Sequence, residues 1–347
     1  MLDEVLGGAE AMATRLAAEL RVIERAGHTL QTLEGKTSPA HAFLIDLLQH
    51  RRAHALDRLV RGLSFAPDNA VSRLLREGLA SNDRARREAA VEHLSASVAP
   101  SIGERLLAAY RATVEKEALL TTPTDVLRAR TWSVNPYVRA AARYLLGEHG
   151  GADDPTLARL SKDEHRVVRE VASCLQERMR EGMCAPDRSR PLTTLEKMLA
   201  LHDAPLLCRL APEGLADLAR SSIETAYAPG STLFREGELG DEVLILLAGE
   251  VTSFQDGGAE EHIISAEAPG RLIGETVGLA PAPRSATVCA GAEGARVLCL
   301  HGDAFRKAMN AHPAMTSEVI RLFAQRLHGR IEGEEPSCMP SGARRMA

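Results

Sequence analysis

The stretch from Leu272 to Ala290 constrains most strongly what this chain can fold into. It reads LIGETVGLAPAPRSATVCA. Gly274 and Glu275 precede a segment long enough for a single helical turn, and the run from Ala286 to Val288 is typical of a β-strand. Because the first N–H groups of a helical turn have no partner within the turn, they can bind an anion. The stretch therefore predicts an anion-binding loop that is closed by a strand.

One carboxylate and one guanidinium share this loop. Arg284 follows Glu275 by nine residues, and the hydroxyl of Ser285 comes next. A guanidinium, a hydroxyl and backbone N–H groups suit a phosphodiester with a single negative charge, and a carboxylate suits the 2′-hydroxyl of a ribose. The combination predicts a cyclic nucleotide as the ligand.

The same residues resemble the phosphate-binding cassette of the cyclic-nucleotide-binding domains of bacterial regulators, kinases and channels. That cassette reads approximately FGE, one helical turn, and PR-(S/T/A)-A-T-V, and this chain has IGE and PRSATV. The resemblance implies that Glu275 binds the ribose 2′-hydroxyl and that Arg284 binds the cyclic phosphate. Further ligand contacts are expected from Gly274, Thr276, Ser285 and Ala286. Thr276 departs from the family, which usually has Leu at that position.

The resemblance also implies a residue on the C-terminal helix that covers the base. Phe323 is the candidate for this lid, and the alternative is that its apolar stripe simply packs on the barrel. Ser285 is compatible with both cAMP and cGMP, and we expect cAMP. A barrel in which Glu275 and Arg284 form a structural pair and bind no ligand is the alternative for the whole domain.

From Glu224 onward, short apolar strands alternate with glycine turns. The expected strands are Thr232–Phe234, Val243–Leu247, His262–Ser265 and Ala295–Leu300. Thr193 and Glu196 form a capping box that begins a helix. Further helices are expected at 205–210, 212–220 and 313–327. This order resembles the β-roll, a jelly-roll-like barrel with flanking helices, of the same family. We therefore expect residues 193–330 to be an α+β cyclic-nucleotide-binding domain.

The N-terminal half shows a different, helical pattern. Three segments share a polar turn followed by an Arg and, three residues later, an Ala: NDRARREAAVEHL from Asn82, NPYVRAAARYLL from Asn135 and DEHRVVREVASCL from Asp163. The polar residue caps a helix, and the small residue lets a neighbouring helix approach closely. The copies resemble the second helices of HEAT repeats, with their xVRxxAxxxL pattern. For residues 1–180 the resemblance implies an α-solenoid that binds an unidentified protein partner.

Two segments lack periodicity. Residues 181–192 contain two prolines and several charges and are expected to be a linker. Residues 331–347 have a similar composition and are expected to be a disordered tail. The tail is too short for a DNA-reading helix-turn-helix of the kind that bacterial relatives carry after the barrel.

Composition and motifs exclude several classes of function. The net charge is −5 and aromatic residues make up 3% of the chain, which argues against a nucleic-acid partner. Arg84, Arg86 and Arg87 form the one basic cluster that could contact phosphate. His50 and His54 lie one helical turn apart, a spacing that can hold a metal, but a solvated helix face explains them better. The six cysteines form no CxxC pair, and no hydrolase or P-loop motif is present.

No apolar run is long enough to span a membrane, and the acidic N-terminus does not resemble a secretory signal. We therefore expect a cytoplasmic, non-enzymatic regulatory protein, without a metal or cofactor, that senses a cyclic nucleotide and signals through a helical protein-binding domain. Two alternatives stay open. One is a structural scaffold with a degenerate barrel. The other is a soluble accessory subunit of a membrane transporter, because helices of this kind joined to such a barrel resemble the soluble part of nucleotide-transporter-like fusions.

Overall fold

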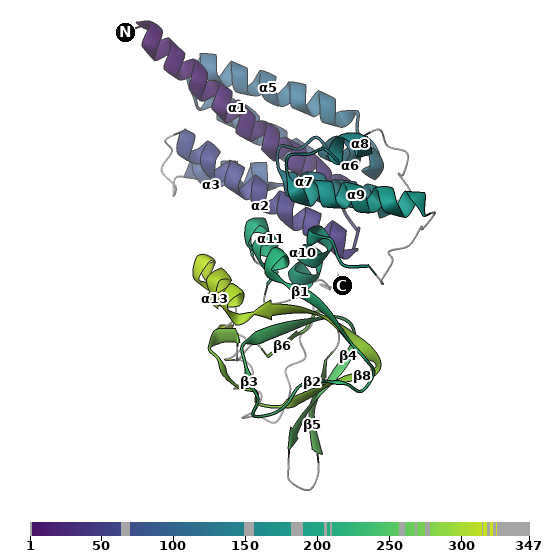
Figure 1. The fold of residues 1–347 in the computed structure, drawn as a ribbon. Helices are drawn as coiled ribbons and strands as arrows, with labels where there is room; N and C mark the ends of the chain where they lie inside the picture. The colour runs from purple at the N-terminus through teal and green to yellow at the C-terminus, as the bar shows by residue number, and fades with distance from the viewer. Residues whose placement is uncertain are drawn as a thin grey trace, which may run out of the picture. The chain divides into compact units, whose positions relative to one another are not determined.

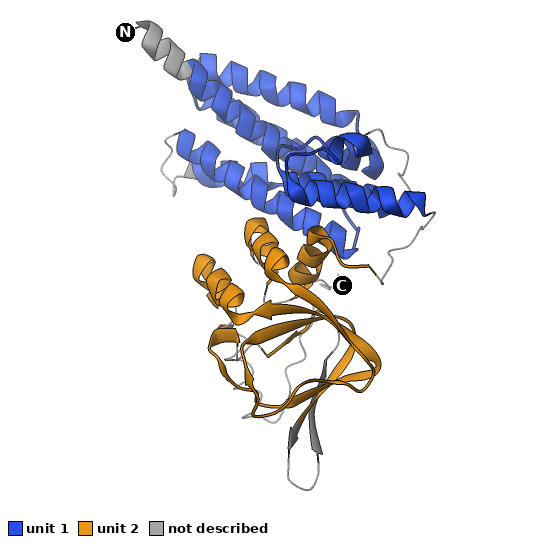
Figure 2. Ribbon diagram, viewed as in Figure 1, with its two compact units in different colours: residues 1–189 blue, residues 190–347 orange. Residues whose placement is uncertain are grey.

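The computed structural model divides into two compact units, residues 1–189 and residues 190–347 (Figure 2). It describes residues 2–63, 70–148, 156–181, 190–204, 207–208, 210–256, 261–267, 269–274, 278–313, 315–317, 320–321 and 324. The expected tail, 331–347, and most of the expected linker, 182–189, lie outside the described residues.

Unit 1 is helical throughout its described residues (Figure 1). Its longest described helix, α1 (Leu2–Thr32), packs against α2 (Pro39–Gly62) and α5 (Pro100–Ala118). Helix α2 packs against α7 (Pro136–Glu148), which in turn packs against α9 (Arg166–Arg180). The remaining helices are α3 (Ala70–Ala80), α4 (Arg84–Ala96), α6 (Pro123–Arg130) and α8 (Thr156–Leu160).

Apolar side chains from α1, α2, α3, α4 and α5 form the main core of unit 1. Fully buried members are Leu20, Ile23, Leu59, Leu79, Val91, Leu94 and Leu106. Their burial stabilises the unit by about 25 cal/mol for each Å² of apolar surface removed from water. No described helix is both long and apolar enough to cross a lipid bilayer.

Two of the three similar segments begin their helices with side-chain caps, whereas α9 has no side-chain cap and Asp163 instead bonds the N–H of His165, the residue before the helix. Asp83, rather than its neighbour Asn82, caps α4 by accepting a hydrogen bond of 2.9 Å from the N–H two residues later. Asn135 accepts one of 3.0 Å at the start of α7, and Asp163 accepts one of 2.9 Å before α9. These caps satisfy backbone N–H groups that the helix itself cannot pair.

The Arg of each segment has a second, shared role that the sequence pattern does not reveal. In Arg87, Arg139 and Arg169, Nη1 donates to the carbonyl oxygens five and six residues earlier in the chain, at 2.6–3.1 Å. The guanidinium thus holds the turn before the helix. Arg139 also donates through Nε and Nη2 to Asp163, which joins α7 to the turn before α9.

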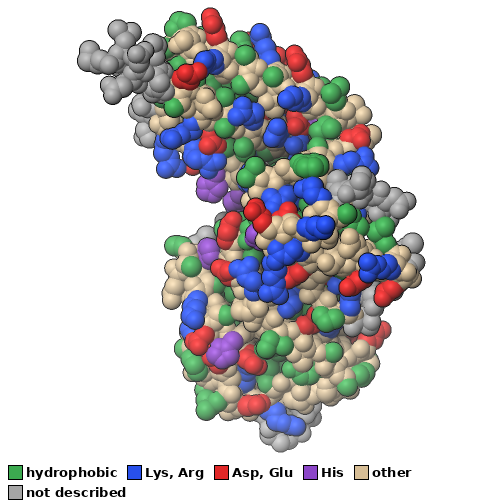
Figure 3. All heavy atoms as spheres, turned by 45° about the horizontal axis from the view of Figure 1, so that its top comes forward, with side chains coloured by type: hydrophobic (Ala, Val, Ile, Leu, Met, Phe, Trp, Pro, Cys, Tyr) green, Lys and Arg blue, Asp and Glu red, His purple; other side chains and the backbone are tan. Residues whose placement is uncertain are grey.

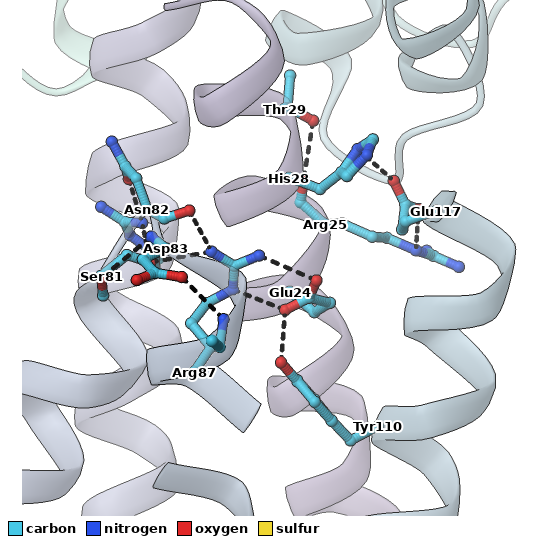
Figure 4. A network of polar contacts seen from close by, with 12 residues as sticks. Glu24, Arg25, His28, Thr29, Ser81, Asn82, Asp83, Arg87, Tyr110 and Glu117 are labelled. Carbon is cyan, nitrogen blue, oxygen red and sulfur yellow. Dashed lines mark hydrogen bonds and ion pairs between the residues drawn. The ribbon is translucent and has the colours of Figure 1, made fainter. Parts of the chain in front are cut away.

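Arg87 is the centre of a buried polar network (Figure 4). Its side chain is 0% exposed, and its Nε and Nη2 donate to the carboxylate of Glu24 on α1, at 2.7 and 3.0 Å. Tyr110 of α5 donates to the same carboxylate at 2.9 Å. Burial disfavours the charge of Arg87, but the hydrogen bonds and charge of Glu24 outweigh burial, and the pKa of Arg87 is raised.

A second polar group ties α6 to α1 and α5. Arg130 is buried, and its Nε donates to Thr29 Oγ1 at 2.7 Å while its Nη2 donates to Glu117. His28 Nδ1 lies 3.6 Å from the same carboxylate (Figure 4). Burial lowers the pKa of His28, which keeps its imidazole mostly neutral at pH 7.

These contacts correct the reading of Arg84, Arg86 and Arg87 as one basic cluster. Arg84 and Arg86 are exposed, but Arg87 is buried against Glu24. The three guanidinium groups therefore do not form one phosphate-binding surface. Figure 3 shows basic and acidic side chains interspersed on the visible face of each unit. In the histidine pair, His50 Nδ1 lies 3.3 Å from the carboxylate of Asp46 on its own helix.

Unit 2 contains an antiparallel β-roll. Its strands are β1 (Ile223–Tyr227), β2 (Thr232–Phe234), β3 (Leu239–Gly240), β4 (Glu242–Asp256), β5 (Glu261–Glu267), β6 (Leu272–Ile273), β7 (Ala282–Pro283) and β8 (Thr287–His301). The larger sheet has the order β1-β8-β4-β5, with β2 added to β8 and β6 added to β4. β3 and β7 form a separate two-stranded sheet.

The two central strands are longer than the sequence predicts. The expected strands Val243–Leu247 and Ala295–Leu300 are parts of β4 and β8, which each run for 15 residues. Gly249 and Gly294 have φ angles of 80° and 79°, and the pairing of β4 with β8 shifts register beside them. Because glycine tolerates these angles, the strands bend at bulges where the sequence suggests turns.

Three helices of unit 2 lie together at one end of the roll (Figure 1). They are α10 (Thr194–Asp203), α11 (Pro212–Ser221) and α13 (Gly302–Ala311). The capping box predicted at Thr193 and Glu196 is confirmed, because each side chain accepts a hydrogen bond from the other residue's N–H. The helix expected at 313–327 is only partly described, and Phe323 lies outside the described residues.

Replacing Glu24 with Ala tests the energetic role of the buried network. The change leaves the Arg87 cation buried without its carboxylate, so we expect it to lower the free energy of unfolding of unit 1 by about 3–5 kcal/mol. Trp132, the single tryptophan of the chain, lies in unit 1, so its fluorescence during urea unfolding reports on that unit.

Glu19→Ala is the matched control. Glu19 lies on the same helix and pairs with Arg58, whose side chain is 56% exposed. Its loss should cost less than about 1 kcal/mol. Equal destabilisation by the two variants would contradict the role given to the Glu24 network.

Candidate functional site

The backbone of Arg284 is held in place from both sides. It directly follows β7, whose residues Ala282 and Pro283 pair with β3. The N–H of Arg284 donates to the carbonyl of Glu238 at 2.8 Å, and its carbonyl accepts from the N–H of Gly237 at 2.9 Å. These bonds extend the β3–β7 pairing by one residue and fix where the side chain of Arg284 begins.

The Arg284 side chain is buried but has no acidic partner among the described residues. It is 6% exposed, and Nη1 donates to the backbone carbonyl of Glu242 at 2.8 Å. Cζ lies 4.0 Å from the centre of the Phe234 ring. Within the described part of the chain, no carboxylate lies within ion-pair distance of this guanidinium, and Nε and Nη2 have no acceptor.

Burial therefore dominates the electrostatics of Arg284. Burial lowers the pKa of the guanidinium, and the nearby charges of Glu242, Glu238 and Asp241 oppose this effect only in part. An arginine keeps its proton at neutral pH even when its pKa is lowered, so the site holds a poorly compensated positive charge. Such a charge attracts an anion, and two N–H groups side by side suit a phosphate or a carboxylate.

Gly274 lies against the same guanidinium. Its φ angle is 76°, a left-handed conformation, and a Cβ added there would lie 2.3 Å from Arg284 Nη1. The N–H of Gly278 donates to its carbonyl at 3.3 Å, which closes one turn between the two glycines. Glu275 and Thr276, which come between these two glycines in the sequence, lie outside the described residues, so their ligand contacts stay predictions.

The two residues after Arg284 face different environments. Ser285 is exposed, whereas Ala286 is 9% exposed and packs inward. Thr287, the next residue, accepts a hydrogen bond of 3.0 Å from the N–H of Glu236 through its hydroxyl. The structure thus places Gly274 against Arg284, with an exposed Ser285 and a buried Ala286 next in the chain.

Arg306 of α13 contacts Gly278, which belongs to the stretch predicted as the anion-binding loop. Its guanidinium donates to the carboxylate of Asp241 at 2.7 and 3.2 Å, and to the carbonyl of Gly278 at 3.1 Å. It also pairs with Asp303. The hydrogen bond from Arg306 lowers the pKa of Asp241. Asp241, Asp303 and His301 lie close enough to one another for a metal site, but Arg306 occupies both carboxylates.

Sequence reasoning did not identify Phe234, Gly240 or Arg306. Gly240 has the position of an ordinary turn glycine, yet its φ angle is not left-handed. A Cβ added there would lie 2.3 Å from Arg284 Nε. No pattern in a single sequence connects Phe234 or Arg306 to the loop, because these contacts depend on how distant strands meet.

Cys299 of β8 provides a probe of the interior near Arg284. Burial and the carboxylate of Glu242 raise the pKa of the Cys299 thiol to about 11. At pH 8 its thiolate fraction should thus be about a hundredfold lower than that of a thiol with a pKa of 9.0. We expect iodoacetamide to modify Cys299 slowly at pH 8 and faster as the pH rises through 11.

Mass spectrometry of tryptic peptides measures this rate for Cys299 separately from the other cysteines. Modification at pH 8 as fast as that of a free thiol in a short peptide would contradict the raised pKa of this partly buried thiol next to Glu242.

Comparison with known proteins supports the reading of unit 2. Residues 224–312 match the sequence profile of the cyclic nucleotide-binding domain. The CRP-like cAMP-activated global transcriptional regulator of Mycobacterium tuberculosis is 28% identical over 119 residues, which are 33% of this chain and 52% of that protein. The Cyclic AMP receptor protein of Thermus thermophilus is 31% identical over 129 residues, which are 37% of this chain and 59% of that protein.

A third relative is the cAMP-dependent protein kinase regulatory subunit of Aspergillus niger, 31% identical over 109 residues, which are 31% of this chain and 26% of that protein. The chain thus spans about half the length of the first relative. The first relative is a transcriptional regulator by name, whereas we expected no nucleic-acid partner for this chain. The profile match confirms what the cassette indicated, and residues 224–312 are a cyclic nucleotide-binding domain.

Proposed function

We propose that unit 2 binds a 3′,5′-cyclic nucleotide and that Arg284 binds its phosphate. The observation that carries this proposal is the buried guanidinium whose Nε and Nη2 have no acceptor among the described residues. Leaving a buried charge uncompensated costs several kcal/mol, and a bound anion would remove that cost. A cyclic phosphodiester carries one negative charge, which matches a single guanidinium.

We further propose that the ligand is cAMP. The three relatives described above carry cAMP or cyclic AMP in their names. Under this proposal Glu275 accepts the ribose 2′-hydroxyl, Ser285 and the backbone at Thr276 and Ala286 add phosphate contacts, and Phe323 covers the base. cGMP is the competing ligand, since the hydroxyl of Ser285 can serve either nucleotide.

A ligand-free, degenerate barrel is less consistent with the geometry. In such a barrel a buried arginine should be neutralised by an acidic partner, because no ligand would compensate its charge. Arg284 instead has a backbone carbonyl and an aromatic ring as neighbours among the described residues. The role as an accessory subunit of a transporter rests on domain order alone.

For unit 1 we propose HEAT-like repeats that offer a protein-binding surface. The support is the recurrence of one contact: Arg87, Arg139 and Arg169 each hold the turn that precedes their helix. A contact that recurs at corresponding positions is what stacked copies of one supersecondary unit produce. We propose that the protein acts as a cytoplasmic regulator rather than an enzyme, and that nucleotide binding changes how unit 1 holds its partner.

Calorimetric titration of the full chain with cAMP, and separately with cGMP, tests the proposed ligand. We expect saturable heat with cAMP. In Arg284→Ala the loss of a desolvated contact between guanidinium and phosphate should weaken binding by about 2–4 kcal/mol, which removes micromolar binding from the measurable range.

Arg220→Ala is the control, because Arg220 lies on α11 of the same unit and pairs with Asp217 at the surface. It should bind cAMP as the unchanged chain does. Absence of heat with both nucleotides in the unchanged chain would overturn the proposal and favour the degenerate barrel.

A further inference from the structure

The guanidinium of Arg284 is enclosed by groups that make no hydrogen bond to it. The Phe234 ring lies on it, with 4.0 Å between the ring centre and Cζ. On other sides two residues without side chains approach it, Gly240 of β3 and Gly274. Tight enclosure limits the positions that a side chain can take. Glycine is favoured at residue 274 by its backbone conformation and at residue 240 by the lack of space for a side chain.

Gly274 is left-handed, so its backbone conformation alone favours glycine. Gly240 is not left-handed, so alanine could adopt its backbone conformation. What excludes a side chain at Gly240 is space: an added Cβ would lie 2.3 Å from Nε, 2.6 Å from Cζ and 2.8 Å from Nη2 of Arg284. Nε and Nη2 are the two atoms that the proposed phosphate would use.

A methyl group at residue 240 would displace the side chain of Arg284 rather than the backbone. β3 is paired with β7 at Leu239 and Gly240, and the N–H of Arg284 donates to the carbonyl of Glu238. These bonds hold both backbones, whereas the Arg284 side chain has only one hydrogen bond among the described residues, from Nη1. The guanidinium would therefore move away from Gly240.

Phe234 acts on the same group from β2. Its position is fixed by the pairing of Phe234 with Val288 of β8. The face of an aromatic ring attracts a cation, and the attraction grows when both groups are shielded from water. The ring thus orients the guanidinium without using the N–H groups that an anion needs.

We infer that Gly240 and Phe234 are positioning residues: Gly240 provides the space and Phe234 the aromatic surface that hold Arg284 ready for the phosphate. This inference rests on the proposed function, since the phosphate is the group that Arg284 is positioned to bind.

The test measures cAMP affinity by calorimetric titration of full-length variants. Gly240→Ala should weaken binding at least about tenfold, because a displacement of about 1 Å at a binding group is enough for such a loss. Leu239→Ala should bind as the unchanged chain does, because Leu239 is the neighbouring β3 residue and its side chain is 79% exposed. Circular dichroism and thermal unfolding verify that each variant is folded.

Repeating the Gly240→Ala substitution in an Arg284→Lys variant distinguishes a positioning role of Gly240 from a general structural effect of the added methyl group. Lysine has no planar guanidinium, so in Arg284→Lys the methyl group of Gly240→Ala has less to displace. We expect Gly240→Ala to weaken the residual binding of Arg284→Lys by less than about twofold. An equal loss in both backgrounds would show a structural effect and overturn the inference.

Phe234 gives an independent pair of variants that does not depend on how well Gly240→Ala folds. Phe234→Leu keeps an apolar side chain but removes the ring and should weaken cAMP binding about two- to tenfold. Phe234→Tyr keeps the ring and should restore binding. If the unchanged chain binds cAMP and these variants bind it equally well, the inference about Gly240 and Phe234 is wrong but the proposed function stands. If the unchanged chain binds no cAMP, both the proposed function and the inference are wrong.

Discussion

A guanidinium buried without an acidic partner among the described residues is the feature on which the function proposed for unit 2 depends. The pairing of β3 with β7 fixes the backbone of Arg284, and the fold then buries its side chain beside an aromatic ring and two glycines. Its one acceptor among the described residues is a backbone carbonyl. Folding thus leaves a cation in a position where only a bound anion compensates it fully, which favours a ligand site over a structural contact.

Arg87 of unit 1 shows one way in which a buried arginine serves structure. Arg87 is also buried and also faces a glycine, Gly27, whose Cβ would lie 2.8 Å from its Cζ. It differs in having the carboxylate of Glu24, which raises its pKa, whereas burial lowers the pKa of Arg284. The pKa values of these two buried arginines therefore shift in opposite directions. Arg87 is paired with a carboxylate within the fold, and Arg284 has no carboxylate within ion-pair distance among the described residues.

The sequence predicts features whose cause is local. The cap at Asn135 and the capping box at Thr193 depend on residues a few positions apart, and both are confirmed. Residues 224–312 are recognisable because the cassette is an ordered local set. The strand predicted at Val243–Leu247 is present within β4, but its predicted end was wrong, because a glycine that bends a strand, as Gly249 does, and one that ends it look alike in sequence.

Features that depend on contacts between residues far apart in the sequence could not be predicted from the sequence. The burial of Arg87 depends on Glu24, 63 residues earlier, so three neighbouring arginines looked like one surface cluster. The position of Arg284 depends on Phe234 and Gly240, which belong to other strands. Such contacts arise only when strands pair, and a single sequence carries no periodicity that marks them.

The most direct measurement is the NMR signal of the Arg284 Nε–H group, assigned by its absence in Arg284→Lys. If this edge of the guanidinium is open for a phosphate, saturating cAMP should shift the signal downfield and slow its exchange with water, while adenosine, which lacks the phosphate, should leave it unchanged. A signal that does not move when cAMP is added would contradict the assignment of Arg284 as the phosphate-binding group.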